Sequence, residues 1–106
     1  MFNLGNLAGT IMFRQIPLVS FAYKNGKLMN AQLLNYDKAI LPFEFMNFRC
    51  DELTVTQFFA ERITPDTRQG LQKYLDKAGI GYYDPEAIIR YQNGRCIHDK
   101  YWVKFD

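Results

Sequence analysis

The side chains of this sequence that could do catalytic chemistry are few. His98 is the single histidine, and the carboxylate of Asp99 follows it directly. Such a pair can act as a general base and its orienting group, but it needs a nucleophile beside it. Cys50 and Cys96 lack metal-ligand spacing, and one histidine cannot build a histidine-rich metal site. We therefore interpret His98 as a surface side chain near a helix start.

The glycines do not form a nucleotide-binding motif. Gly79-Ile80-Gly81 lacks the third glycine of a phosphate-binding loop, and it follows a predicted helix rather than a strand. The sequence also contains no G-x-x-x-x-G-K-[ST], H-E-x-x-H or C-x-x-C motif. We expect a protein that is not an enzyme and that holds no cofactor or metal.

Composition predicts one domain with an unusual share of aromatic residues. The 106 residues are 48% hydrophobic and 23% charged, which is ordinary for a folded domain spanning residues 1–106. The net charge of +2 is too small to predict nucleic-acid binding. Aromatic residues make up 16% of the chain, and interfaces are enriched in them. We expect some of these rings to contact a protein partner.

The N-terminal half carries no targeting or membrane signal. No lysine or arginine precedes Arg14, whereas a secretory signal begins with a charged region. No apolar stretch reaches the roughly 18 residues that a membrane-spanning helix needs. These features predict a cytoplasmic protein without a membrane partner.

The first half of the chain predicts a small antiparallel β-meander over residues 10–48. Residues 17–23 alternate between two sides of a strand: Val19, Phe21 and Tyr23 against Leu18, Ser20 and Ala22. Asn25-Gly26 is a strong hairpin signal because both residues tolerate a positive φ. Residues 27–34 then place Met29, Ala31 and Leu33 on one face. We expect residues 43–45 to be a short strand or an extended loop, and residues 1–9 to be partly loose.

The second half predicts three or four short helices, so the fold class is α+β. Asp51 or Thr54 can cap a helix that continues to Arg62. Thr64-Pro65 predicts the start of a second helix, over residues 65–78, and Asp84-Pro85 the start of a third, over residues 85–92. Residues 97–105 are a final helical turn or an edge strand.

The aromatic rings divide into two groups by their place in these elements. Some lie on predicted inward faces: Phe21, Tyr23, Phe58, Tyr74 and Tyr91. Others lie in segments with no assigned buried face: Phe43, Phe45, Phe48, Tyr82, Tyr83, Tyr101 and Trp102. The second group is where we expect partner contacts.

An ordered series of short segments resembles a kinase family. Residues 58–68 (FFAERITPDTR) are similar to the stretch of HipA-type serine/threonine kinases in which a phenylalanine pair precedes a short L-x-P-[DE] segment and an arginine. The other segments of the series appear in the family's order: Ile16-Pro17-Leu18-Val19, Leu41-Pro42, the helix ending at Gly79, the helix starting at Asp84, Asn93-Gly94-Arg95 and residues 99–104. The series covers residues 13–106 and resembles the region that precedes the kinase core.

The chain departs from this family because the kinase core is absent, so no catalytic residue can be carried over. The resemblance implies a free-standing N-terminal subdomain that binds a separately encoded HipA-like kinase as an antitoxin, inhibitor or regulatory subunit. We expect its contact residues among Phe59, Arg62, Arg68, Tyr101 and Trp102, since aromatic residues and arginines dominate interface energetics.

Two other functions remain open at this stage. The helices over residues 65–92 could form a helix-turn-helix of a small transcriptional or phage regulator, although Pro85-Glu86-Ala87 is a poor start for a recognition helix. The chain could also be a phage-encoded inhibitor of another host protein, which would be a small protein-binding domain of the same kind.

Overall fold

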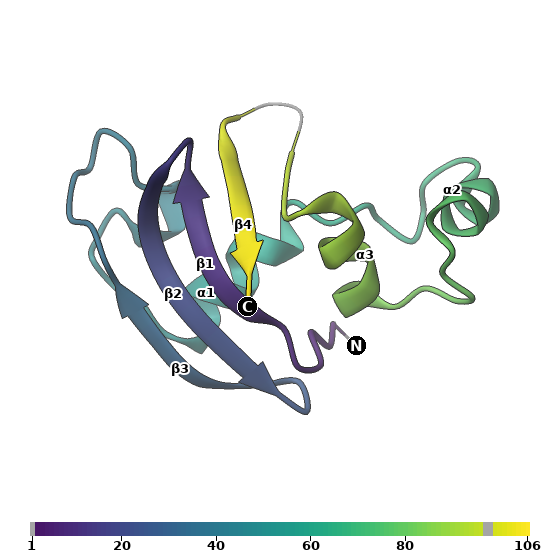
Figure 1. Cartoon of the computed structure of the whole chain (residues 1–106), viewed down its shortest axis with the longest axis horizontal. Coiled ribbons are helices and arrows are strands. Elements are labelled where there is room, and N and C mark those ends of the chain that lie inside the picture. The colour runs from purple at the N-terminus through teal and green to yellow at the C-terminus, as the bar shows by residue number, and fades with distance from the viewer. Residues whose placement is uncertain (1, 97–98) are drawn as a thin grey trace.

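A computed structural model of the chain describes residues 2–96 and 99–106, and it confirms the α+β fold class. His98 therefore lies outside the described residues. Four strands form one antiparallel sheet in the order β3-β2-β1-β4. Figure 1 shows this sheet with α1 behind it and α2 standing away from it. The elements are β1 (Ala8–Phe13), β2 (Ile16–Lys24), β3 (Lys27–Leu33), the 3₁₀-helix η1 (Phe43–Phe45), α1 (Glu52–Ala60), α2 (Leu71–Ala78), α3 (Pro85–Gln92) and β4 (Tyr101–Phe105).

The sheet is completed by the last strand rather than by the middle of the chain. β4 pairs with β1 from Gly9↔Phe105 to Phe13↔Tyr101, which confirms the edge-strand alternative for the tail. The predicted meander is too long, because β3 ends at Leu33 and residues 43–45 form a 3₁₀-helix instead of a strand.

Two irregularities in strand pairing correct the predicted faces of the sheet. Ile11 pairs with Val19 and Met12 with Pro17, so Leu18 is an extra residue in β2. Such a bulge breaks the simple alternation, and Leu18 is fully buried beside Val19. Between the pairs Ala22↔Asn30 and Tyr23↔Leu28, Met29 is the extra residue, and it is 64% exposed. The predictions that Leu18 lies opposite the core and that Met29 shares the face of Leu33 are therefore wrong.

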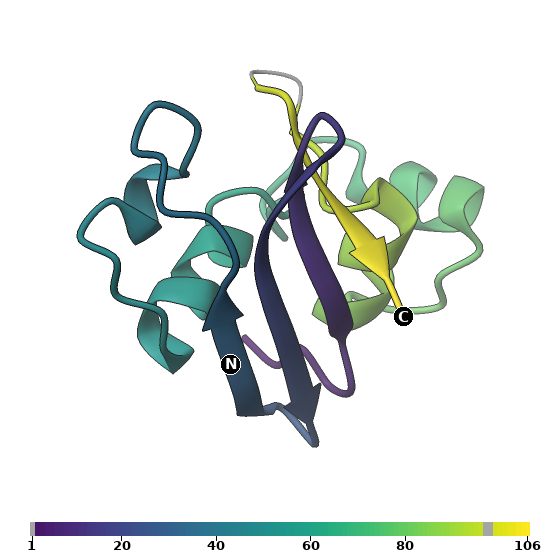
Figure 2. The same cartoon turned by 60° about the vertical axis from the view of Figure 1, so that its left-hand side comes forward.

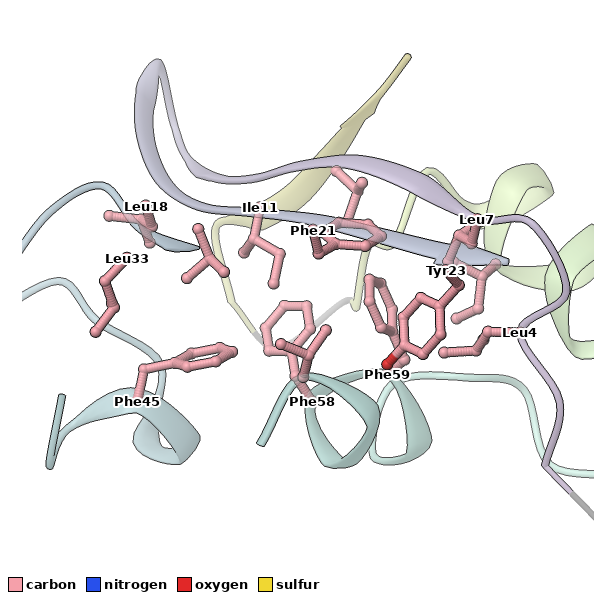
Figure 3. Packing of buried hydrophobic residues seen from close by; sticks show 14 of the residues in the cluster. Leu4, Leu7, Ile11, Leu18, Phe21, Tyr23, Leu33, Phe45, Phe58 and Phe59 are labelled. Carbon is pink, nitrogen blue, oxygen red and sulfur yellow. The ribbon is translucent and has the colours of Figure 1, made fainter. Parts of the chain in front are cut away.

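The core fills the space between one face of the sheet and the helices. Figure 3 shows Phe45, Phe58 and Phe59 reaching from η1 and α1 toward the sheet. All three are at most 1% exposed. Burying one such ring contributes roughly 2–3 kcal/mol, so these helices are held mainly by their contact with the sheet.

Residues 2–7, which precede β1, pack against the sheet, contrary to the expectation of a partly loose segment. Leu4 is 1% exposed and Leu7 is fully buried. The backbone N–H of Tyr23 donates to the carbonyl of Leu7, and that of Gly26 to the carbonyl of Gly5. The segment thus closes one end of the core.

The helix boundaries follow local signals in two cases out of three. Asp51 caps α1 and forms a capping box with Thr54, and Asp84 caps α3 with Pro85 in its first turn. The predicted start of the second helix at Pro65 is wrong, since α2 begins only at Leu71. Gly70 adopts a left-handed conformation with φ of 74°, and residues 66–70 offer no apolar side chain that could hold an earlier turn against the core.

Of the rings predicted to face inward, Phe21, Tyr23 and Phe58 are buried, whereas Tyr91 is 45% exposed. Tyr91 instead packs edge-to-face against the half-buried Tyr74, with ring centroids 5.8 Å apart. Among the helices of the described residues, none has the length and apolar character that would let it span a membrane.

Candidate functional site

Phe59, one of the predicted contact residues, lies in the core. It is fully buried, and its ring centroid is 5.1 Å from that of Phe21 on the sheet and 5.3 Å from that of Phe58. Neighbouring positions on a helix are about 100° apart, so a broad apolar face can bury both rings of a phenylalanine pair. The prediction that Phe59 is exposed for a partner is therefore wrong.

Arg62 is also withdrawn from the surface, because its side chain is only 7% exposed. Its Nε donates to the carbonyl of Gly94 at 2.8 Å. Its Nη1 and Nη2 donate to the two carboxylate oxygens of Asp99 at 3.1 and 2.5 Å. The guanidinium carbon lies 4.6 Å from the centroid of the Phe58 ring. Arg62 thus joins the end of α1 to the segments after α3 and before β4. The prediction that Arg62 is an exposed contact residue is therefore wrong.

Tyr101 and Trp102 point to opposite sides of β4, as successive strand residues do. Tyr101 is half-buried against Phe13, with centroids 5.4 Å apart, and its hydroxyl donates to the carbonyl of Ile40 at 2.6 Å. Burial raises the pKa of this phenol. Trp102 is half-exposed, and its indole Nε1 donates to the carbonyl of Arg14 at 2.6 Å. The Trp102 ring is therefore more accessible to a partner than the Tyr101 ring, because it lies on the side of β4 away from the core.

The five predicted residues do not form one surface. Phe59, Arg62 and Tyr101 meet around the buried Phe58. Arg68 is exposed in the loop before α2, where its guanidinium carbon lies 4.4 Å from the centroid of the Tyr74 ring. Whether Arg68 and Trp102 bind a partner stays a prediction.

An exposed apolar surface lies at η1 and the start of α1. Phe43 is 85% exposed and Leu53 is 59% exposed. They flank a hollow of about 250 Å³ whose lining also includes Met46 and Gln57. We call Phe43, Met46 and Leu53 the Phe43 surface.

The backbone under the Phe43 surface is anchored by the core. Phe45, two residues after Phe43 in the same 3₁₀ turn, is fully buried. Residues two apart in a 3₁₀-helix point in different directions, so burial of Phe45 directs Phe43 to solvent. Phe43 is therefore exposed because η1 packs against the core through Phe45.

The carboxylate of Glu44 lines the hollow of this surface. The pKa of Glu44 is raised to about 7, first by burial and then by hydrogen bonding and charge repulsion from Glu61, while the charge of Arg62 acts in the opposite direction. Arg49 also lines the hollow, and it forms an ion pair with Asp51. The Phe43 surface thus combines apolar side chains with a carboxylate that titrates near neutral pH.

Sequence reasoning placed Phe43 among the unassigned rings but missed Leu53. The helical spacing could have indicated its exposure, because Leu53 lies off the face formed by Val55, Phe58 and Phe59. An apolar side chain on the opposite face of a short helix has no core to enter. Leu53 could have been identified as exposed from this spacing alone.

Two other hollows are larger, and one of them, of about 450 Å³, is lined by polar and titratable side chains together with a tyrosine: Thr64, Tyr74, Gln92, Arg95, Cys96 and Asp99. The other, of about 460 Å³, has a mostly apolar lining that also includes Asp66: Phe2, Ala60, Ile63, Pro65, Tyr83 and Pro85. Within the described ranges, no group of three or more His, Cys, Asp and Glu side chains could hold a metal ion. 

The predicted recognition helix, α3, begins with Asp84 and Glu86 and buries Ile88 and Ile89. Its first turn is thus acidic, whereas phosphates are bound by basic and neutral donors. DNA binding through these helices stays a prediction.

Comparison with protein-family models, curated proteins and solved structures finds no match to this chain.

Proposed function

We propose that this chain is a non-catalytic protein-binding module that docks on a HipA-like kinase and regulates or neutralises it. The observation that supports binding is the Phe43 surface, where a phenyl ring 85% exposed stands beside an exposed Leu53. Single exposed apolar residues are common, but Phe43, Met46 and Leu53 gather around one hollow, and contiguous exposed apolar patches mark interaction sites. The choice of kinase partner rests on the sequence resemblance of residues 13–106.

The physical case for binding is that Phe43 is presented on an ordered backbone. Phe45 anchors η1 in the core, and the backbone N–H of Met46 donates to the carbonyl of Phe43 at 3.2 Å. An aromatic side chain with few rotatable bonds loses little conformational entropy when a partner covers it. Covering this ring would therefore stabilise a complex with little opposing loss of conformational entropy.

The test is co-expression with a HipA-like kinase encoded in the same genome, read out as growth rescue and co-purification. The wild-type chain should restore growth and retain the kinase on an affinity column. The Phe43→Ser/Leu53→Ser double variant should lose both effects, since truncating the few residues that dominate an interface costs about 2 kcal/mol or more each.

Tyr82→Ser is the matched control, because Tyr82 is 71% exposed and does not line the hollow at η1. This variant should behave as wild type. Full rescue by the Phe43→Ser/Leu53→Ser variant would show that the Phe43 surface is not the contact. Failure of the wild-type chain to bind or neutralise any such kinase would refute the proposed function itself.

A further inference from the structure

The face of the sheet that points away from α1 is uncovered, as Figures 1 and 2 show. We call it the open face. In-register pairing places Lys104, Thr10, Ser20 and Gln32 in one row across all four strands. Trp102 belongs to the same face, because residues two apart in a strand share a side.

Charge is distributed unevenly between the sheet and the rest of the chain. The four strands contain Lys24, Lys27 and Lys104 but no aspartate or glutamate. All 11 acidic residues lie in helices, turns and loops. A solvated sheet face that serves solubility alone usually mixes both signs of charge. The open face has only one sign along its strands.

Further cations gather at the end of this face where Trp102 lies. The guanidinium carbon of Arg95 is 5.7 Å from the centroid of the Trp102 ring. Lys100 precedes β4 by one residue, and its carbonyl accepts from the backbone N–H of Arg14. Arg14, Arg95 and Lys100 are exposed, and none of them takes part in the three ion pairs found among residues 2–96 and 99–106.

The carboxylates near β4 do not neutralise this group. Asp99 is held by both terminal nitrogens of Arg62. Asp106 follows Lys104 by two residues at the other end of β4, and the ion pairs found among residues 2–96 and 99–106 do not join these two side chains. The positive potential around Trp102 is therefore available to an outside partner.

The indole ring itself indicates what that partner presents. Its Nε1–H is already donated to the carbonyl of Arg14, so the ring offers its apolar face rather than a polar group. Exposed cations beside an apolar ring suit a segment that carries carboxylates together with an aliphatic or aromatic side chain. Single-stranded nucleic acid usually stacks its bases on several aromatic side chains. The strand residues that face this side include one aromatic ring, Trp102.

From these observations we infer that the open face around Trp102, Arg95, Lys100 and Lys104 is a docking surface for an acidic protein segment that places an apolar side chain on the indole. This surface is separate from the Phe43 surface, which lies on the helix side of the sheet. The inference therefore does not depend on the proposed kinase partner.

Trp102 provides a direct readout because it is the single tryptophan of the chain. Titration with a short peptide of alternating glutamate and leucine should change its fluorescence emission, and the effect should weaken strongly at high salt. The Arg95→Glu/Lys104→Glu variant should bind this peptide about tenfold or more weakly, because two attractive contacts become repulsive.

The control variant is Lys73→Glu/Lys77→Glu, which makes the same charge change on the exposed side of α2. It should bind the peptide as wild type does. Circular dichroism of each variant establishes that the fold is retained. If Arg95→Glu/Lys104→Glu does not fold, Arg95→Gln/Lys100→Gln should still weaken binding several-fold.

Three results would overturn the inference. The first is no change in Trp102 emission with the acidic peptide at low salt. The second is an equal loss of binding in the α2 control, which would indicate attraction by net charge alone. The third is tighter binding of a single-stranded oligonucleotide than of the peptide, which would assign the face to nucleic acid.

Discussion

Replacing Arg62 by alanine should destabilise the fold strongly, although the sequence suggested a surface arginine. The substitution removes the hydrogen bond to the carbonyl of Gly94 and both hydrogen bonds to Asp99. It also removes the contact between the guanidinium and the Phe58 ring. The ends of α1, α3 and the loop before β4 would then lose the side chain that joins them.

The magnitude follows from the burial of the two partners. Removing one partner of a fully buried ion pair costs about 3–5 kcal/mol, chiefly because a charge is left unpaired. The Asp99 side chain is 32% exposed, so its carboxylate would regain part of its hydration. We expect the free energy of unfolding to fall by about 2–4 kcal/mol after this discount, which lowers Tm by roughly 10 °C or more in a domain of this size.

The assay is urea denaturation followed by far-ultraviolet circular dichroism. Arg68→Ala is the matched control, since Arg68 is exposed and forms no ion pair among the described residues. It should change the free energy of unfolding by at most about 1 kcal/mol, because it removes only the exposed contact with the Tyr74 ring. A double-mutant cycle of Arg62→Ala with Asp99→Ala should give a coupling energy of at least about 1 kcal/mol. Equal effects of Arg62→Ala and Arg68→Ala would refute the structural role of Arg62.

Three further predictions concern backbone conformation, pH and helix capping. Gly94→Ala should cost about 2 kcal/mol or more, because φ is 63° and the new Cβ would lie 2.4 Å from a methyl carbon of Val103. Gly79→Ala has a similar φ of 76° but open space around it, so thermal denaturation should show a loss of only about 1 kcal/mol; equal losses would contradict the role of the clash. The pKa of Glu44 is raised to about 7, so the native state holds a proton that the unfolded chain releases above its ordinary pKa of 4.5. The free energy of unfolding should therefore fall as pH rises from 4.5 to 7, by about 1 kcal/mol once solvent screening is included, and a Glu44→Gln variant with the same pH slope as wild type would refute this. Asp51→Ala should lower the free energy of unfolding through loss of the α1 cap, and an unchanged urea midpoint would contradict it.

Local signals in the sequence predicted the parts of the fold that depend on neighbouring residues. The hairpin at Asn25-Gly26 and the caps at Asp51 and Asp84 each depend on the conformation or hydrogen bonding of a few consecutive residues. The same holds for the end of α2 at Gly79, where φ is 76°. These features could be read directly because their physical causes lie within one turn of the chain.

The candidate surfaces could be predicted only in part. The sequence singled out Phe43 and Trp102 as rings without a buried face, and both are at least partly exposed. It could not separate them from Phe45, which is also in an irregular segment but is fully buried. The difference arises from the direction in which η1 meets the sheet, which no local pattern encodes.

The sequence by itself determined the α+β class, the hairpin, the starts of α1 and α3 and the surplus of aromatic rings. Tertiary structure decided what those side chains do. The bulge that buries Leu18 depends on pairing with β1, and the burial of Arg62 depends on Asp99, 37 residues away in sequence. The open face depends on β4 pairing with β1, which aligns Lys104 with Thr10. Exposure and charge clustering depend on residues that are distant in the chain, so composition and spacing could not show which side chains share a surface.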